Sequence, residues 1–423
     1  MVVHEFFNNF PNIQNTRVLD LTDTRNLLAG HLLARIGAEV IQIEPPSGHA
    51  ARTQLSEETY SASGALWQAY GANKKSITCD ITTSSGREII LELCKTADVL
   101  IESSHPGYMQ ELGLDYDTLS QLFPHLIYVS ITPFGSSGPK AHYQATDLIV
   151  WAAGGALLPT VAAGAVPVSM SIPQSFRHAS ADAVSGVLIA LYERVRSGLG
   201  QHVDISAQLS VAQSTLSVIL ADAVGHPDYS LRPKPSTRKT PEGCVPVGQT
   251  KWHAQDGLIE LHLGSGAATG RFSNNLMSWV MAEGYEVTDE LAQFDWSQPL
   301  SYEDEDTYLI VAQAHQILAE FLQTKTKVEL IEAAIEKKLL LAPVNTIKDL
   351  LGSKHLNARE AFVEVVIGKD CFSMPRYLFK SESLPSSVPS KAADIGQHND
   401  SIYLHELSMP PEHLHKLMKM GVI

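Results

Sequence analysis

The sequence predicts an α/β protein, with a Rossmann-like, mainly parallel sheet in a large domain and a smaller α+β domain further along the chain. Three observations support this prediction. Short runs rich in β-branched residues alternate with segments of helical periodicity through the first half. Residues 225–248 then form an irregular stretch with several prolines, which is typical of a linker. After this stretch come one strand pattern (256–264) and two helical patterns (274–284 and 303–325).

The expected elements of the large domain follow one another closely. Residues 16–22 ("TRVLDLT") and 39–44 ("EVIQIE") have strand patterns, and residues 26–38 between them have helical spacing. Further strands are expected at 74–81, 98–103 and 125–134, and a further helix at 84–97. Strands that alternate with helices in this way favour a largely parallel sheet.

Residues 179–195 carry the most regular helical pattern. Valines and leucines at helical spacing predict one apolar stripe, made of Val184, Val187, Leu188, Leu191 and Val195. A second face carries only small residues and would allow another helix to approach closely: Ala179, Ala183, Gly186 and Ala190. The glycine-rich segment 197–206 ("SGLGQHVDIS") then ends the helix and begins a strand.

Composition excludes several classes of partner. A formal net charge of -15 disfavours nucleic acid and anionic membrane surfaces, since both attract basic proteins. Neither a signal peptide nor a long apolar run is present, so we expect a cytoplasmic protein without a membrane span. The 4 cysteines lack CxxC spacing and the 17 histidines lack HExxH spacing, so neither a metal site nor a disulfide framework is expected.

Two common nucleotide sites also lack their motifs. A strand, helix and strand that end at Glu44 could suit a dinucleotide, with the acidic side chain on a ribose. The turn at residues 22–30 ("TDTRNLLAG") has no GxGxxG, however, so the pyrophosphate would have no glycine-lined seat. A nicotinamide-dependent oxidoreductase is therefore kept only as an alternative that a cofactor-binding measurement would revive. No GxSxG elbow or P-loop is present either.

Several segments, taken in order, resemble the family III CoA-transferases, also called the CaiB/BaiF group. This family includes carnitine dehydratase-like proteins, bile-acid-inducible proteins and α-methylacyl-CoA racemases. The similar segments are residues 17–22 ("RVLDLT"), 32–48 ("LLARIGAEVIQIEPPSG"), 73–81, 97–116, 126–139, 147–155, 186–206 and 327–351. The resemblance extends from about Thr16 to the C-terminus.

The resemblance implies a domain plan and a mode of assembly. A chain of 423 residues is long enough for two domains. We expect a large α/β domain at residues 1–224, a linker at 225–248, a small domain at 249–340 and a return segment at 341–423 that completes the large domain. Family members form interlocked dimers that bind acyl-CoA at the domain interface. The resemblance thus implies coenzyme A or acyl-CoA as a substrate, with no permanently bound cofactor.

The family's transfer chemistry uses one aspartate, which attacks the acyl-CoA thioester to give a mixed anhydride and then an enzyme-CoA thioester. An ungapped count from Pro167, or back from Val187, places that aspartate position at Phe176. A phenyl ring cannot act as a nucleophile. Asp182 lies more than one and a half helical turns further on and on a different side of the helix, which disfavours it as a replacement.

Other positions depart from the family's pattern as well. The racemases' histidine position corresponds to Thr146 and their aspartate position again to Phe176, so racemase activity is disfavoured. Glu111 replaces an arginine that commonly follows the "PG" motif, and a carboxylate would repel a pyrophosphate there. Basic residues that could still contact CoA are Arg52, Lys74 and Lys75. His178, near the start of the helix, is a candidate base.

These observations leave three functions open. The first is a CoA-transferase-like protein that acts on acyl-CoA thioesters, for example by moving CoA between carboxylic acids, as a homodimer. The second is a non-catalytic subunit that pairs with an aspartate-bearing paralogue, because "SIPQSF" resembles the aspartate-free chains of heteromeric enzymes such as the benzylsuccinate CoA-transferases. The third is an acyl-CoA lyase, hydratase or isomerase that acts without a covalent aspartate, through His178 or through a residue that the sequence does not identify.

Overall fold

The computed structural model describes residues 13–53, 64–157, 170–216, 220, 223–225, 237–240, 243–246, 249–300, 304–382 and 387–423. Its contacts divide the chain into two units. The first comprises Met1–Val161, Pro167–Arg232 and Asn357–Ile423, and the second Ala162–Val166 and Pro233–Leu356. The N-terminal half and the C-terminal segment therefore lie in one unit, with the second unit inserted between them.

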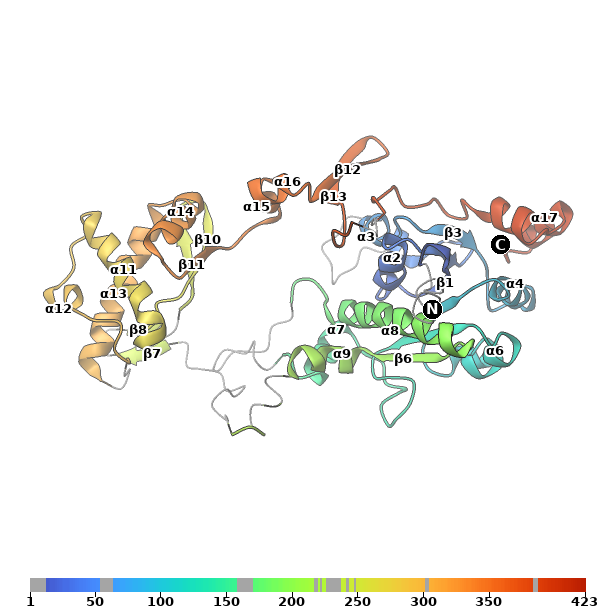
Figure 1. The fold of residues 1–423 in the computed structure, drawn as a ribbon, viewed down its shortest axis with the longest axis horizontal. Coiled ribbons are helices and arrows are strands. Elements are labelled where there is room, and N and C mark those ends of the chain that lie inside the picture. The colour runs from blue at the N-terminus through green and yellow to red at the C-terminus, as the bar shows by residue number, and fades with distance from the viewer. Residues whose placement is uncertain are drawn as a thin grey trace, which may run out of the picture. The chain divides into compact units, whose positions relative to one another are not determined.

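A six-stranded sheet forms the centre of the first unit, and every pair of neighbouring strands is parallel. The strand order is β3-β2-β1-β4-β5-β6, and Figure 1 labels β3, β1 and β6 of this sheet. The strands are β1 (Arg17–Leu21), β2 (Glu39–Glu44), β3 (Lys75–Thr78), β4 (Val99–Glu102), β5 (Ile127–Thr132) and β6 (His202–Ser206). The predicted Rossmann-like parallel sheet is confirmed. β2 and β3 follow one another on one side of β1, whereas β4, β5 and β6 follow on its other side. The strand order therefore reverses between β1 and β4.

Both faces of this sheet are covered, so successive strand residues point into two separate cores. Val18 belongs to one core and Leu19 to the other, and both side chains are fully buried. The core that includes Leu19 is covered by α4 (Ser84–Cys94), α5 (Tyr108–Glu111), α6 (Tyr116–Leu122) and α17 (Pro411–Lys419). The core that includes Val18 is covered by α2 (Leu27–Arg35), α7 (Asp147–Ala153), α8 (Ser175–Ser197) and α9 (Ala207–Ser214).

Helix α8 packs through its small residues. Ala179, Ala183 and Ala190 are buried, and α8 contacts α2, β5 and β6 (Figure 1), so the predicted close approach is confirmed. A Cβ added at Gly186 would lie 2.7 Å from Val203 Cγ1 on β6. The predicted valine and leucine stripe is only partly correct, because Leu188 remains 42% exposed. Val187 and Leu191 are buried in the core together with the small residues, whereas Leu188 and Val195 lie at the exposed flank of the helix.

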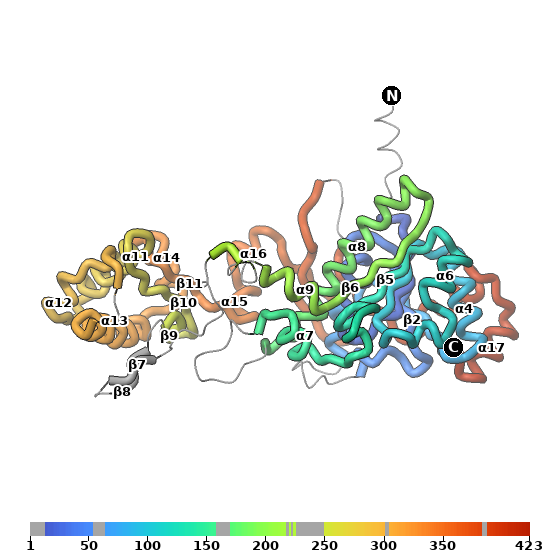
Figure 2. The backbone as a smooth tube through the Cα atoms, turned by 90° about the horizontal axis from the view of Figure 1, so that it is seen from below, coloured from blue at the N-terminus to red at the C-terminus, as the bar shows by residue number. Residues whose placement is uncertain are grey.

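The C-terminal segment returns to the first unit beside β3. The backbone N–H of His398 donates to Ser76 O, and Tyr403 Oη donates to Thr78 O at 2.7 Å. Helix α17 then lies beside α4 in both Figure 1 and Figure 2, where Leu417 shares a core with Ile90. This segment also contains a π-helical stretch (Asp400–Glu406) and the hairpin of β12 (Phe362–Ile367) and β13 (Asp370–Pro375).

The second unit contains the antiparallel sheet of β11 (Leu341–Pro343), β10 (Gly257–Leu261) and β9 (Lys251–Ala254). Its helices include α11 (Gly266–Ala282), α12 (Asp289–Ala292), α13 (Glu305–Gln323) and α14 (Lys327–Lys337). Because β11 pairs with β10, this unit extends to Leu356, past the expected boundary at residue 340. Part of the expected linker forms an antiparallel pair, β7 (Thr237–Thr240) with β8 (Gly243–Pro246).

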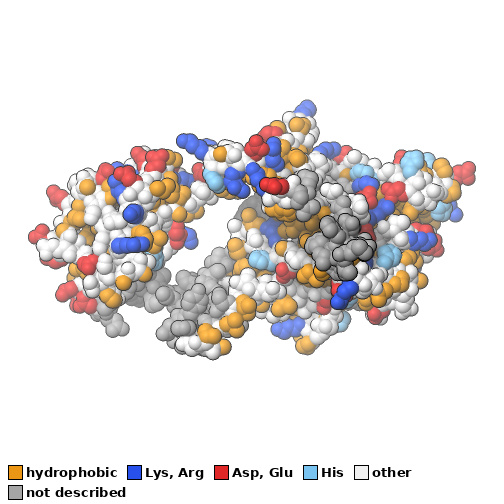
Figure 3. All heavy atoms as spheres, in the orientation of Figure 1, with side chains coloured by type: hydrophobic (Ala, Val, Ile, Leu, Met, Phe, Trp, Pro, Cys, Tyr) orange, Lys and Arg blue, Asp and Glu red, His pale blue; other side chains and the backbone are white. Residues whose placement is uncertain are grey.

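The remaining described elements are short. They are two 3-10 helices (Ile13–Asn15 and Ala50–Arg52), α3 (Ala65–Tyr70), α15 (Ile347–Leu351) and α16 (Lys354–Ala358). On the face shown in Figure 3, acidic and basic side chains are interspersed over both units. None of the helices in the described ranges is both long and apolar enough to traverse a bilayer. Residues 1–12, where the sequence gives no sign of a signal peptide, lie outside those ranges.

A buried ion pair joins β1, β2 and α2. Lys74 Nζ donates to Asp20 Oδ2 at 2.7 Å, to Gln42 Oε1 at 2.9 Å and to the Leu27 carbonyl oxygen at 3.0 Å. Both charged side chains are inaccessible to solvent. His31 lies nearby on α2, and burial, followed by the positive charges of Lys74 and Arg35, lowers its pKa from 6.5 to about 3. The imidazole is therefore neutral in the folded protein at neutral pH.

This lowered pKa predicts a loss of stability in mild acid. The unfolded chain binds a proton at His31 below pH 6.5, whereas the folded protein does not until about pH 3, so acidification favours unfolding across that window. We expect His31→Gln to reduce the fall in the free energy of unfolding between pH 7 and 5 by about 2 kcal/mol. Urea denaturation at both pH values measures this change. His355→Gln, at an exposed position on α16, is the control. The prediction would be contradicted if the free energy of unfolding fell by as much between pH 7 and 5 in His31→Gln as in the wild type.

Candidate functional site

The reversal of strand order places the candidate site. In open parallel sheets, ligands bind outside the carboxyl ends of the strands at the point where strand order reverses. Here that point lies between β1, which is followed by Thr24 and Arg25, and β4, which is followed by Ser103 and His105. Two cavities open at this edge, and both are lined by Arg25 and Thr146.

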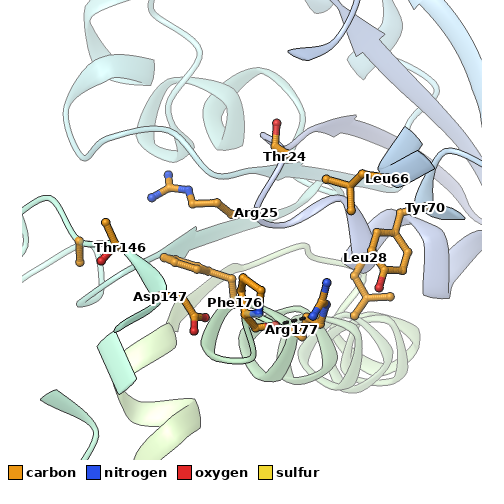
Figure 4. Close-up of a pocket in the computed structure, with 11 residues that line it drawn as sticks. Thr24, Arg25, Leu28, Leu66, Tyr70, Thr146, Asp147, Phe176 and Arg177 are labelled. Carbon is orange, nitrogen blue, oxygen red and sulfur yellow. Dashed lines mark hydrogen bonds between the residues drawn. The ribbon is translucent and has the colours of Figure 1, made fainter. Parts of the chain in front are cut away.

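The first cavity, here called the α8 cavity, has a volume of about 200 Å³. Its walls are mainly apolar and come from the start of α8, from α2 and from α3 (Figure 4). The lining residues include Arg25, Leu28, Leu66, Tyr70, Asp147, Phe176 and Arg177. The second, the β4 cavity, has a volume of about 470 Å³ and is lined by Ser103, Ser104 and His105 among others.

Phe176 forms part of the wall of the α8 cavity. It is the second residue of α8, is 4% exposed and belongs to the core on that face of the sheet. The guanidinium carbon of Arg25 lies 4.8 Å from the centroid of its ring (Figure 4). Arg25 is in turn paired with Asp23 at 2.6 Å. The position to which the sequence assigns the missing nucleophile therefore holds a buried phenyl ring beneath a cation.

Asp147 fixes the start of α8 against the start of α7. Its Oδ1 accepts hydrogen bonds from the backbone N–H of Ser175 at 2.8 Å and from Ser175 Oγ at 2.5 Å. Ser175 is the first residue of α8 and is fully buried. Asp147 is the only carboxylate among the described residues that line the α8 cavity. One of its oxygens is thus engaged in holding the backbone that positions Phe176.

His178, the candidate base, and Asp182, which the sequence disfavoured as a replacement nucleophile, both lie outside this wall. His178 is half-buried, with its ring centroid 6.0 Å from that of Trp151, and its side chain does not line the α8 or the β4 cavity. Asp182 is one turn further along α8 and lines neither cavity. The structure therefore does not bring either group to the position of Phe176, and a catalytic role for either stays a prediction.

The three predicted CoA-binding cations have acidic partners. Arg52 binds the Glu44 carboxylate at 2.6 Å and stacks on the ring of Trp67 at 3.9 Å. Lys75 pairs with Glu39 and Glu406. As described above, Lys74 is buried and donates to three acceptors, so its ammonium has no donor left for a phosphate. CoA binding by Arg52 and Lys75 stays a prediction.

Glu44 is also occupied within the protein. Its carboxylate accepts hydrogen bonds from Arg52, from Ser76 Oγ at 2.5 Å and from the backbone N–H of His49 at 2.7 Å. The ribose contact of the nicotinamide alternative would have to displace these partners. Among the described residues, no group of three or more His, Cys, Asp and Glu side chains is arranged to hold a metal.

Three lining residues were not predicted from the sequence: Arg25, Tyr70 and Arg177. A signal existed for Arg25, because it follows a strand at the carboxyl edge of a parallel sheet. Arg177 directly follows Phe176 in the sequence, but the direction in which its side chain points depends on the residue at which α8 begins. Tyr70 approaches from α3, and only the folded chain brings that helix to the cavity (Figure 4).

Comparison with known proteins agrees with the sequence and the fold. The model of a protein family described as CoA-transferase family III matches residues 13–399. The chain belongs to CoA-transferase family III. The predicted family is therefore confirmed, and the α8 cavity lies in the part of the chain that the family model covers.

Similar family members match nearly the whole chain. The succinyl-CoA:(R)-benzylsuccinate CoA-transferase subunit BbsE of Thauera aromatica is 29% identical over 416 residues, which cover 96% of this chain and 97% of that protein. A formyl-CoA:oxalate CoA-transferase of Streptomyces avermitilis is 26% identical, covering 97% and 99%. A solved CAIB/BAIF family protein from Brucella suis shares the fold with a TM-score of 0.75 at 24% identity, covering 92% and 97%.

The contact between Asp147 and Ser175 predicts a stability difference. Asp147→Ala leaves the buried N–H of Ser175 without its acceptor and leaves the hydroxyl only its longer contact, at 3.3 Å, with the backbone carbonyl oxygen of residue 147, so we expect the free energy of unfolding to fall by about 1–3 kcal/mol. Ser175→Ala removes the contacts of the hydroxyl but keeps the N–H bond, and should cost about 1 kcal/mol. Urea denaturation measures both. Asp182→Asn on the same helix is the control, and an Asp147→Ala variant as stable as this control would disprove the role.

Proposed function

We propose that this chain binds acyl-CoA thioesters and takes part in the transfer of CoA between carboxylic acids as a subunit without the nucleophilic aspartate. The observation that carries the proposal is Phe176. Its ring is buried in the first turn of α8, beneath Arg25, at the position where the family resemblance places the nucleophile. A partner chain that bears the aspartate would supply the covalent step.

The chemistry of the transfer explains why a partner is needed. A carboxylate oxygen attacks the thioester carbonyl, the carbon–sulfur bond breaks, and CoA leaves as a thiolate while a mixed anhydride remains. A phenyl ring has no lone pair to form that bond. The carboxylate of Asp147 lines the same cavity, but its Oδ1 already holds the start of α8 through Ser175. The proposal therefore assigns this chain a supporting role in the covalent step.

A relative supports the heteromeric form of the proposal. The Thauera aromatica protein, which aligns with 96% of this chain, is named as a subunit of its CoA-transferase. By contrast, a lyase, hydratase or isomerase without a covalent aspartate would need a base at the reacting carbon. His178 does not line the α8 cavity, so that alternative has no structural observation in its favour.

Co-expression with an aspartate-bearing family paralogue tests the proposal. We expect the two chains to copurify, and the mixture, but neither chain alone, to transfer CoA from succinyl-CoA to a carboxylic acid from a panel, followed by chromatography of the CoA esters. The partner's aspartate-to-asparagine variant should abolish transfer. Full turnover by this chain alone would overturn the subunit role.

Replacing Phe176 tests whether the surrounding site still supports covalent chemistry. Phe176→Asp places a carboxylate below Arg25, and we expect a covalent CoA adduct, detected by mass spectrometry, with succinyl-CoA. Phe176→Asn has nearly the same shape without a nucleophile and serves as the matched control. CoA binding without an adduct would indicate different chemistry, and loss of both would leave only a structural role for this chain.

A further inference from the structure

We infer that the α8 cavity binds an organic carboxylate with an aromatic or branched apolar body, and that Arg177 is the counter-ion of its carboxylate. This inference deepens the proposed function, on which it rests for its biological role, by naming the class of acid or acyl group that the chain would recognise. The binding itself is measurable without CoA and without a partner chain.

Arg177 is a cation without an acidic partner among the described residues. Its Nη1 donates to the carbonyl oxygen of Pro173 at 2.5 Å, and the guanidinium carbon lies 5.8 Å from the centroid of the Tyr70 ring. Arg25, on the opposite wall, is instead paired with Asp23. Arg177 lies in the first turn of α8, and its guanidinium has further N–H donors besides the one bonded to Pro173. Figure 4 shows its side chain between those of Phe176 and Tyr70.

The surroundings of Arg177 favour an anion. The guanidinium of Arg177 is half-buried beside apolar walls, so it loses part of its hydration. A charge-assisted hydrogen bond to an anion would replace the lost water contacts. The start of α8, a helix of 23 residues, adds the positive end of the helix dipole at the same place. Both effects stabilise a negative group bound at the mouth of the cavity.

The shape of the cavity selects the remainder of the ligand. Leu28, Leu66, Tyr70 and Phe176 present hydrocarbon and aromatic surfaces to its interior. Its volume of about 200 Å³ exceeds the roughly 150 Å³ at which an apolar protein cavity binds benzene. A phenyl ring or a branched chain of similar size therefore fits.

A carboxylate suits this site better than a phosphate. The planar guanidinium of Arg177 matches the two oxygens of a carboxylate. Asp147 lines the same cavity, so a doubly charged phosphate would face about twice the repulsion that a single carboxylate faces. With this assignment Phe176 is part of a recognition surface, which gives the ring a role in place of the missing nucleophile.

Calorimetric titration of the full chain tests the inference with three probes: 3-phenylpropanoate, the neutral 3-phenylpropanamide and inorganic phosphate. We expect the acid to bind at least about tenfold more tightly than the amide. Titration with inorganic phosphate should give no heat of binding and should not displace the acid. Arg177→Gln should weaken binding of the acid by about tenfold or more and leave the amide unchanged. Arg177→Lys should retain part of the affinity.

Arg196→Gln is the matched control, because Arg196 lies on the same helix but is exposed and paired with Glu193. Equal binding of acid and amide by the wild type would overturn the inference, as would an Arg177→Gln variant with unchanged affinity or displacement of the acid by phosphate. The titration contains neither CoA nor a partner chain, so the two proposals can fail separately. If the chain binds the acid but the co-expressed pair does not transfer CoA, only the proposed function is contradicted. Active transfer with no selectivity for the acid would contradict this inference alone.

Discussion

The position of the site depends on one buried charge. Lys74 holds a fully buried ammonium that is stable only because three acceptors, from Asp20 on β1, Gln42 on β2 and Leu27 on α2, surround it. These contacts fix α2 over the first two strands and so place the turn that carries Arg25. Gly30 is required for the same reason, because a Cβ there would lie 1.9 Å from Asp20 Oδ2. Removing one partner would leave the opposite charge buried and uncompensated.

The architecture could be predicted from the sequence because local patterns determine it. Alternation of β-branched runs and helical spacing was enough to predict the parallel sheet, and small residues at helical spacing predicted how α8 packs. The difference between Lys74 and Lys75 could not be predicted, since neighbouring residues on a strand point to opposite faces and burial depends on what covers each face. Lys74 is therefore buried below α2, whereas Lys75 pairs with Glu39 and Glu406.

The site was predictable in position and less so in composition. The family resemblance located the start of α8 and assigned the nucleophile position to Phe176, because both are features of order along the chain. Arg177 and Tyr70 belong to the site only because α3 and α8 both pack on α2, which brings together segments about one hundred residues apart. Family membership does not by itself fix the chemistry of the site, since a fold positions a cavity and individual side chains decide what it can do.

The return of the C-terminal segment also affects how the chain is made. The Ser76 backbone N–H donates to the His398 ring across 322 residues of sequence, and the complete second unit lies between them. At about 5–20 residues per second of synthesis, roughly 16–64 s separate the appearance of these two residues. During that interval the edge of β3 lacks its native cover, while the second unit has its own core and is complete in sequence. The first unit therefore cannot complete this edge of its sheet until residues 398–403 have been made, and a chain that stops before them would keep β3 uncovered.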